Sequence, residues 1–201
     1  ARLKNTPSYS GRYLDSVFDI ILNFLIFMTI CYVSESSIWY AILAFLGVQL
    51  QGTLYNYYYV ILRNKLVGGD TTSKVFEYKT PKALPGESQK SVDILFKIYT
   101  IVYGVFDRII HFLDKDAYKV KSFPNWFMTL VSVYGLGFQL LIIAVMLPLG
   151  YLEYIVPFFI LFTLPIVLFI AIRKYFLGNN YPIQSLKAET FSLATMTSSS
   201  L

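Results

Sequence analysis

The sequence predicts an all-α integral membrane protein, and two observations carry this prediction. Hydrophobic residues occupy 56% of the 201 positions and charged residues only 14%, whereas a soluble domain contains about 25% charged residues. The apolar residues also lie in runs long enough to cross a hydrocarbon core of about 30 Å as helices. A transmembrane β-barrel would instead show short segments of alternating hydrophobicity. We therefore expect several membrane-spanning helices.

The expected transmembrane helices are four apolar segments: Gly11–Val33, Ile38–Leu62, Trp126–Leu149 and Tyr151–Ile172. The second and third segments contain no charged residue, and the fourth contains only Glu153 near its start. The first segment differs because two acids, Asp15 and Asp19, lie inside it. A charged side chain within a membrane span costs about 3 kcal/mol or more, so these two acids need a functional explanation.

The basic residues predict the orientation of these helices, because loops rich in lysine and arginine stay in the cytoplasm. Basic residues lie before the first segment, between the second and the third, and after the fourth. The two short loops on the other side carry only the acids Glu35 and Glu153. We therefore expect a multi-pass protein with its basic loops in the cytoplasm. The short loops and compact size favour a bacterial inner membrane.

A fifth apolar segment, Val92–Leu113, is predicted to lie on the membrane surface. It is interrupted by five ionisable residues: Asp93, Lys97, Asp107, Arg108 and His111. If this segment crossed the membrane, three lysines that follow it would lie on the outer side, and every later loop would be reversed. An amphipathic helix on the cytoplasmic surface avoids both problems.

The rest of the chain predicts one membrane domain with a tail. We assign residues 1–178 to the membrane domain and residues 179–201 to a flexible tail, which has little apolar pattern. Glycine and proline pairs favour turns in the loop Val67–Ser91. Cys31 is the sole cysteine, so an internal disulfide is excluded. Because the first residue is Ala1 and not methionine, we expect a segment upstream of it.

The two acids of the first helix predict a metal site near the cytoplasmic surface. Residues four apart lie on one face of a helix, so Gly11, Asp15, Asp19 and Asn23 form one stripe. Two neighbouring carboxylates stay ionised only when a cation neutralises them, and their oxygens suit hard cations such as Mg²⁺ and Mn²⁺. The alternative is a polar lining, or a buried pairing of the acids with an arginine such as Arg2.

Two neighbouring residues extend this hypothesis to a ligand that contains phosphate. The planar guanidinium of Arg2 is suited to hold a phosphate group with two hydrogen bonds. Gly11 has no side chain, so a ligand or a neighbouring helix can approach the site closely there.

The spacing of these residues resembles the signature of the CDP-alcohol phosphotransferases (CDP-alcohol phosphatidyltransferases). The second half of that signature runs Ala-Arg, eight residues, Gly, three residues, Asp, three residues, Asp. The chain matches it at Ala1, Arg2, Gly11, Asp15 and Asp19, and the stretch YLDSVFD is similar to the third helix of the family. The first two aspartates and the first glycine of the signature would precede Ala1. The resemblance implies that the four spans are the third to sixth of a six-helix core.

The resemblance also implies an enzyme of phospholipid synthesis. Family members transfer a substituted phosphoryl group from a CDP-linked donor, either CDP-diacylglycerol or a CDP-alcohol, to an acceptor alcohol and release CMP. They use two divalent ions, Mg²⁺ or Mn²⁺. By analogy, Asp15 is a metal ligand, and Asp19 is both a metal ligand and the catalytic general base. Arg2, Ser8 and Gly11 would bind the donor. The implied partners are these substrates, membrane lipids and a second copy of the chain in a homodimer, without nucleic acid.

Two other functions are compatible with acids inside a membrane span. One is a transporter or channel whose acids conduct or couple ions, and the other is a non-catalytic, degenerate relative of the family. The acceptor also stays open at this point, with glycerol phosphate, inositol or its phosphate, serine, choline and ethanolamine as candidates. Either the donor or the acceptor can carry the lipid tail.

Overall fold

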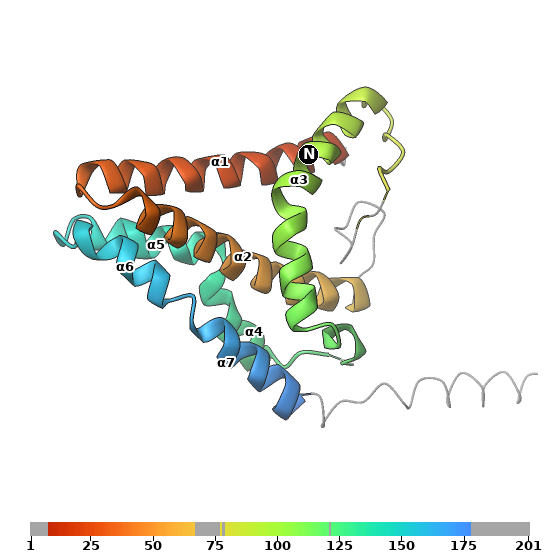
Figure 1. Ribbon diagram of the computed structural model, residues 1–201. Coiled ribbons are helices and arrows are strands. Elements are labelled where there is room, and N and C mark those ends of the chain that lie inside the picture. Colours follow the sequence, from red (N-terminus) through yellow and green to blue (C-terminus); the bar gives the residue numbers. More distant parts are fainter. Residues whose placement is uncertain (1–7, 67–76, 78, 121, 178–201) are drawn as a thin grey trace, which may run out of the picture.

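The computed structural model describes residues 8–66, 77, 79–120 and 122–177. Arg2 and the predicted tail, residues 179–201, lie outside these ranges, as do residues 67–76 and 78 of the predicted loop. All regular structure in the described residues is helical, without a strand. The α-helices, shown in Figure 1, are α1 (Tyr9–Val33), α2 (Ile38–Leu66), α3 (Gln89–Leu113), α4 (Asn125–Val131), α5 (Leu136–Met146), α6 (Leu152–Leu161) and α7 (Pro165–Ile172).

Three helical segments in the described residues are long and apolar enough to span a membrane: Tyr9–Val33, Ile38–Asn64 and Leu152–Leu177. A fourth span is formed if the bent pair Asn125–Tyr134 and Leu136–Met146 counts as one. These segments coincide with the four predicted from hydropathy, so the prediction of an all-helical, multi-pass membrane fold is confirmed.

Both C-terminal spans are broken, each for a local reason. Between α4 and α5 the chain forms a short 3₁₀ turn and then becomes extended at Gly135, with φ −66° and ψ 144°. The two helices bend there by 53°. Between α6 and α7 the break ends at Pro165, which begins α7. Proline lacks a backbone N–H and is tolerated in the first turn of a helix, where that group has no intrahelical partner.

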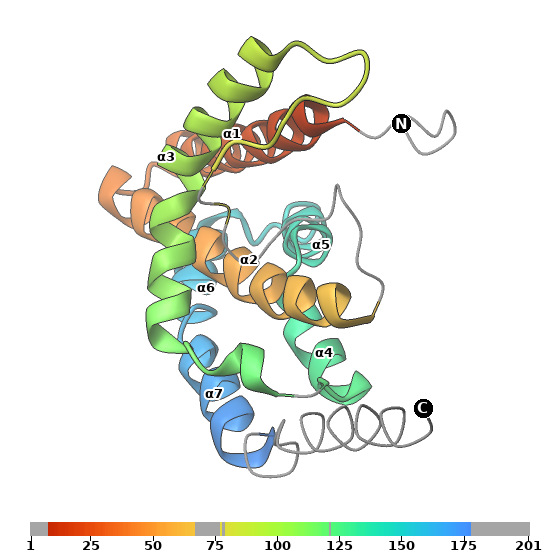
Figure 2. The same ribbon diagram turned by 90° about the vertical axis from the view of Figure 1, so that its right-hand side faces the viewer.

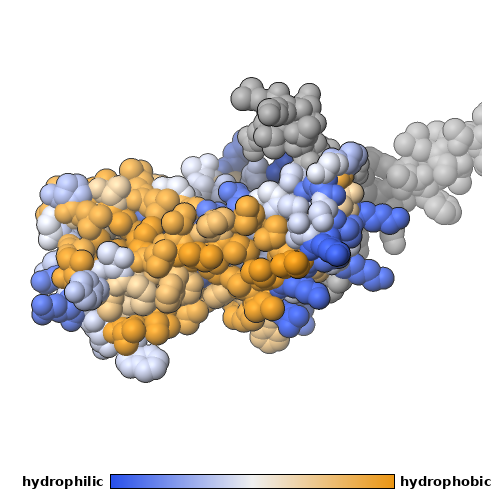
Figure 3. Space-filling view, turned by 90° about the horizontal axis from the view of Figure 1, so that it is seen from above, coloured by the Kyte–Doolittle hydropathy of each residue, from blue (hydrophilic) through white to orange (hydrophobic). Residues whose placement is uncertain are grey.

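The helices pack so that α3 crosses one end of the others. The helix α1 contacts α2, and α3 runs across both of them near the beginning of α1, as Figure 1 and Figure 2 show from two directions. Figure 3 shows an apolar surface over the middle of the molecule, with hydrophilic residues gathered toward the two ends. This distribution is typical of helices that cross an apolar layer and end in water.

The helix α3 has the amphipathic character predicted for Val92–Leu113. It is not among the candidate spans, and it buries Val92, Phe96 and Ile110 against the protein. Large apolar side chains are nevertheless exposed on the rest of its surface: Ile94, Ile101, Val105 and Phe112. Apolar side chains on such a helix are suited to the interface between lipid and water. The cytoplasmic side remains a prediction.

A buried ion pair joins the end of α3 to the last helix. Asp114 is fully buried and Arg173 is 3% exposed. The guanidinium of Arg173 contacts both carboxylate oxygens of Asp114, and its Nε donates to Oδ2 at 2.6 Å. The hydroxyl of Tyr58, on α2, donates to the same Oδ2 at 2.8 Å. The hydroxyl of Tyr57 donates to the Asp114 carbonyl at 3.0 Å. One residue thus connects three parts of the fold.

We predict that removing one member of this ion pair destabilises the fold more than removing both. Asp114→Asn leaves a buried guanidinium without its counter-charge, which typically costs about 3 to 5 kcal/mol. The double variant Asp114→Asn/Arg173→Met removes both charges and should recover part of that loss. Thermal unfolding of both single variants and the double variant in detergent measures the coupling. A loss of stability in the double variant that equals the sum of the losses in the two single variants would contradict the prediction.

Candidate functional site

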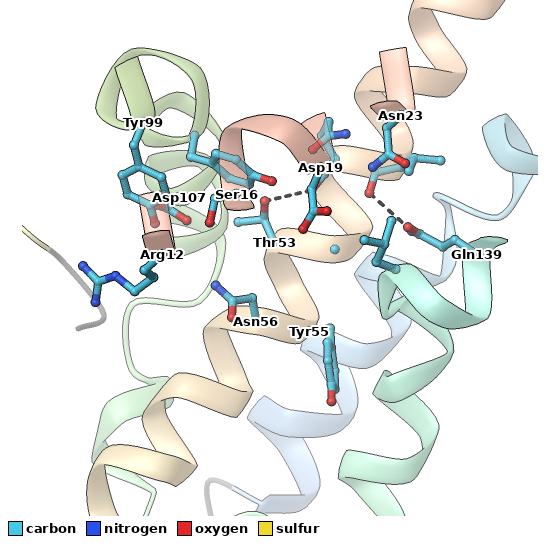
Figure 4. Close-up of a pocket in the computed structure, with 15 residues that line it drawn as sticks. Arg12, Ser16, Asp19, Asn23, Thr53, Tyr55, Asn56, Tyr99, Asp107 and Gln139 are labelled. Carbon is cyan, nitrogen blue, oxygen red and sulfur yellow. Dashed lines mark hydrogen bonds between the residues drawn. The ribbon is translucent and has the colours of Figure 1, made fainter. Parts of the chain in front are cut away.

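A polar cavity of about 270 Å³ lies between α1, α2, α3 and α5. Figure 4 shows Tyr99 and Asp107 of α3 at one side of this cavity, Gln139 of α5 at the other, and Asp19 of α1 between them. The polar residues that line it are Arg12, Ser16, Asp19, Asn23, Gln49, Thr53, Asn56, Tyr55, Tyr99, Tyr103, Asp107 and Gln139. Such a concentration of polar groups among apolar helices marks the cavity as the candidate site.

The helix α1 divides the predicted stripe of residues between two surfaces. Asp19 and Asn23 line the cavity together with Ser16, since residues three and four apart share one face of a helix. Gly11 and Asp15 are exposed and lie on a neighbouring face, outside the cavity wall. Asp19 is therefore the predicted site residue that the structure places at the cavity, one helical turn from the exposed Asp15.

The carboxylates of α1 act electrostatically on the helix that crosses them. Burial raises the pKa of the Tyr103 hydroxyl above its ordinary value, and the negative charges of Asp19, Asp107 and Asp15 raise it further. Tyr103 thus experiences all three carboxylates at once. Burial and the negative charge of Glu77 also raise the pKa of Asp107, to about 6.

The two predicted metal ligands are suitable for a divalent ion but form a small donor set. Among the described residues, no group of three or more His, Cys, Asp or Glu side chains could hold a metal ion. Asp15 and Asp19 provide two carboxylates that interact with each other. Mg²⁺ in proteins is usually held by one or two carboxylates together with waters and substrate phosphates. Two carboxylates are within the number of protein ligands that such a site uses, and a Mg²⁺ ion at Asp15 and Asp19 remains a prediction.

The start of α1 is fixed by Glu87, which lies just before α3. The carboxylate of Glu87 accepts hydrogen bonds from the hydroxyl of Ser8 at 2.8 Å, the backbone N–H of Tyr9 at 3.1 Å and that of Ser10 at 2.8 Å. Ser8 is the N-cap of α1, and its hydroxyl also accepts from the Gly11 N–H at 2.9 Å. Ser8, predicted to bind the donor, thus holds the helix terminus in this structure.

Arg12 lies at the edge of the cavity and is paired with Glu77. Its Nη2 lies 2.7 Å from both carboxylate oxygens of Glu77 and donates to the Tyr13 hydroxyl at 2.7 Å. Tyr13 donates in turn to Glu77 at 2.5 Å. Tyr13 also packs against Phe96 of α3 with a ring distance of 5.6 Å, so this cluster joins the first turns of α1 to α3.

Most polar residues of the cavity wall are not predicted as site residues from the sequence, among them Gln49, Tyr99, Tyr103 and Asp107. Tyr99, Tyr103 and Asp107 follow each other at intervals of four, so they share one face of α3. This interval could have indicated the site from the sequence, because a row of polar side chains along one face of an apolar helix needs polar groups or water to contact. Gln49 gives no such signal, since its place in the cavity depends on contacts between distant segments.

Glu87 predicts a dependence of stability on acidity. Its burial opposes ionisation, but the hydrogen bonds from Ser10, Ser8 and Tyr9 outweigh this effect and lower the pKa of Glu87 from 4.5 to about 2. A lowered pKa stabilises the fold above the ordinary value, and this contribution is lost as the pH falls toward about 2. Glu87→Gln should therefore cost about 1 kcal/mol at pH 7.

The measurement is the unfolding free energy of the original protein and of Glu87→Gln between pH 2 and pH 7. The difference between the two proteins should be constant above about pH 4.5 and shrink below it, the range given by the ordinary and lowered pKa values. A difference that grows as the pH falls would contradict the predicted role of Glu87.

Comparison of the chain with protein-family models, with curated proteins and with solved structures finds no match. The resemblance to the CDP-alcohol phosphotransferases therefore remains a prediction from the residues between Ala1 and Asp19.

Proposed function

We propose that the chain is the membrane domain of a CDP-alcohol phosphotransferase, an enzyme that moves a substituted phosphoryl group from a CDP-linked donor to an alcohol. The observation that carries this proposal is the position of Asp19. It lies at the spacing of the family signature and in the wall of a polar cavity between the spans. A carboxylate that served only helix packing would not require a cavity large enough for several water molecules.

Asp15 and Asp19 are the residues of this chain that would hold the divalent ions. Their carboxylates are one helical turn apart at the end of a span, with Asp15 exposed and Asp19 partly buried. Bound ions would neutralise the pyrophosphate of the donor and stabilise charge on the attacking and leaving oxygens. The upstream segment expected from the family signature would add further ligands.

Asp19 also acts as the general base, because an alcohol in the cavity can reach its carboxylate. The oxygen of the alcohol forms a bond to the phosphorus that carries the transferred group, and its proton goes to Asp19. The bond between that phosphorus and the CMP oxygen breaks, so CMP leaves. Gly11 is exposed, and a side chain there would crowd the Ser8 hydroxyl at 3.1 Å, so glycine keeps this part of α1 clear for the nucleotide in the proposal. In this proposal Arg2 binds a donor phosphate, and the carboxylate of Glu87 positions Ser8.

The orientation of the helices supports a site at the cytoplasmic surface. The cavity lies near the beginning of α1 and under α3, at the end of the molecule where the basic segments of the sequence also begin or end. A site at this boundary allows a lipid to enter from the membrane while the nucleotide stays in water. The proposal includes an inner-membrane location in a bacterium and the homodimer implied by the family.

A transporter is the second candidate function, because transporters also place acids in a polar cavity among their spans. It predicts ion-dependent flux of a substrate across vesicles and no formation of CMP. A non-catalytic relative predicts neither flux nor CMP. The two readouts therefore separate the three functions.

We predict that the complete polypeptide exchanges labelled CMP with a CDP-linked donor in the presence of the acceptor alcohol and of Mg²⁺ or Mn²⁺, because the label enters the donor by reversal of the transfer. Asp19→Ala should lower the exchange rate by about 100-fold or more, since it removes the base, and Asp15→Ala should raise the metal concentration needed. Asp116→Asn is the matched control, because Asp116 is an exposed acid far from the cavity lining. Normal exchange by both α1 variants would refute the assignment.

A further inference from the structure

Asp19 lies where two neighbouring faces of α1 meet, and in the proposed reaction each face serves a different substrate. One face is exposed and carries Gly11 and Asp15, the residues that the family resemblance relates to the donor and the metal. The neighbouring face lines the cavity, which α3 covers with Tyr99, Tyr103 and Asp107. In the proposed reaction, the group held in this cavity is the alcohol, because its hydroxyl must reach Asp19.

Asp107 is a carboxylate in the cavity wall that has no counter-charge among the described residues. No ion pair of the described residues includes it, and its side chain is only partly exposed. The positive residue of the cavity wall, Arg12, is paired with Glu77 at 2.7 Å. A carboxylate withdrawn from water without a cation is unfavourable, and its raised pKa is the expected consequence. A ligand with a positive charge would relieve this cost.

The neighbours of Asp107 favour the same ligand. Tyr103 lies one helical turn before it and Tyr99 one turn further, and both rings line the cavity. The two rings are stacked with centroids 5.3 Å apart and an interplanar angle of 21°. Electron-rich aromatic faces attract organic cations, and a carboxylate beside aromatic rings is a common way of binding an ammonium group.

A second, independent feature favours a ligand with an oxygen atom. Gln49 lines the cavity and is 4% exposed, and its amide Nε2 has no hydrogen-bond partner. Buried amide groups are almost always paired, because an unpaired donor costs about 1 to 3 kcal/mol. The other buried glutamines nearby are paired, since Gln139 donates to Gln51 at 3.0 Å. A hydroxyl oxygen in the cavity would satisfy Gln49.

We propose that the cavity binds a small alcohol that carries a positively charged nitrogen, with the nitrogen at Asp107 and the tyrosines and the hydroxyl side toward Asp19 and Gln49. This inference rests on the proposed function and names its alcohol. The volume of about 270 Å³ suits a head group and not a whole phospholipid. An alcohol phosphate without a positively charged nitrogen is disfavoured, because it would meet two carboxylates and a guanidinium that Glu77 already neutralises.

The test measures equilibrium binding of choline and ethanolamine to the full chain in lipid nanodiscs, with inositol and glycerol 3-phosphate as comparison ligands. The two amino alcohols should bind at least 10-fold more tightly than the other two. Asp107→Asn should lower their affinity by about 10-fold or more, and Gln49→Leu should lower it to a smaller extent. Asp93→Asn is the matched control, since Asp93 lies on the same helix outside the cavity and should leave the affinity unchanged.

Two results would overturn the inference. One is tighter binding of inositol or glycerol 3-phosphate than of the amino alcohols, and the other is unchanged affinity in Asp107→Asn. Asp107→Glu keeps the charge and should retain most of the binding, so a general folding defect would appear as loss of binding in both variants and in their unfolding temperature.

The same ligand chemistry can come from a free alcohol or from a CDP-linked alcohol, and a second arm separates these sources. Binding of CDP-choline that weakens on Asp107→Asn as strongly as binding of choline does would place the alcohol of the donor in the cavity. If Asp107→Asn weakens the binding of choline and not that of CDP-choline, the cavity binds the free acceptor alcohol. Amino-alcohol binding without CMP exchange would refute the proposed reaction and leave the binding site in place, so the two failures are distinguishable.

Discussion

The buried pair of Asp114 and Arg173 fixes the position of α3, and the candidate site depends on that position. The pair holds the C-terminal end of α3 to α7, while Tyr58 holds it to α2. At the other end, Glu87 binds the first residues of α1. The helix is thus held by ionised carboxylates at both ends, where removing a partner would leave a buried charge or an open helix terminus. Between these two points, its polar face lies over the cavity.

Buried amides between the spans hold α2 against α5 and the C-terminal span, beside the cavity. Gln51 donates to the Thr163 hydroxyl at 2.9 Å, and Gln139 donates to Gln51 at 3.0 Å. Inside a membrane such groups find few other partners, so they hold the helices in one register. Gly47 contributes by its size, since a Cβ there would collide with the Thr163 hydroxyl. The α2–α6 contact is therefore close, and the open space lies on the opposite, polar side of α2.

The spans could be predicted from the sequence because hydropathy is a local property that the membrane itself selects. The sequence also indicates Asp19 as a candidate site residue, since an acid inside a span is costly. Its spacing from Asp15 matches the signature of the CDP-alcohol phosphotransferases. For Asp107, the sequence indicates only a charge on an amphipathic helix. Its place in the cavity depends on how α3 crosses α1, which is determined by the distant contacts of Asp114 and Glu87. The role of Ser8 as a helix cap required the same information.

The two faces of α3 differ in polarity, and the proposed function uses both of them. The face with Ile94, Ile101 and Phe112 is apolar and exposed, although α3 does not span the membrane. The face with Tyr103 and Asp107 is polar and closes the cavity. In the proposed reaction, α3 would rest on the lipid interface with one face and cover the polar cavity with the other, so that it would hold a water-soluble alcohol beside the head groups of lipids. The proposed transfer joins a soluble substrate to a lipid-linked one. Holding both substrates next to each other would lower the entropic cost of bringing them together.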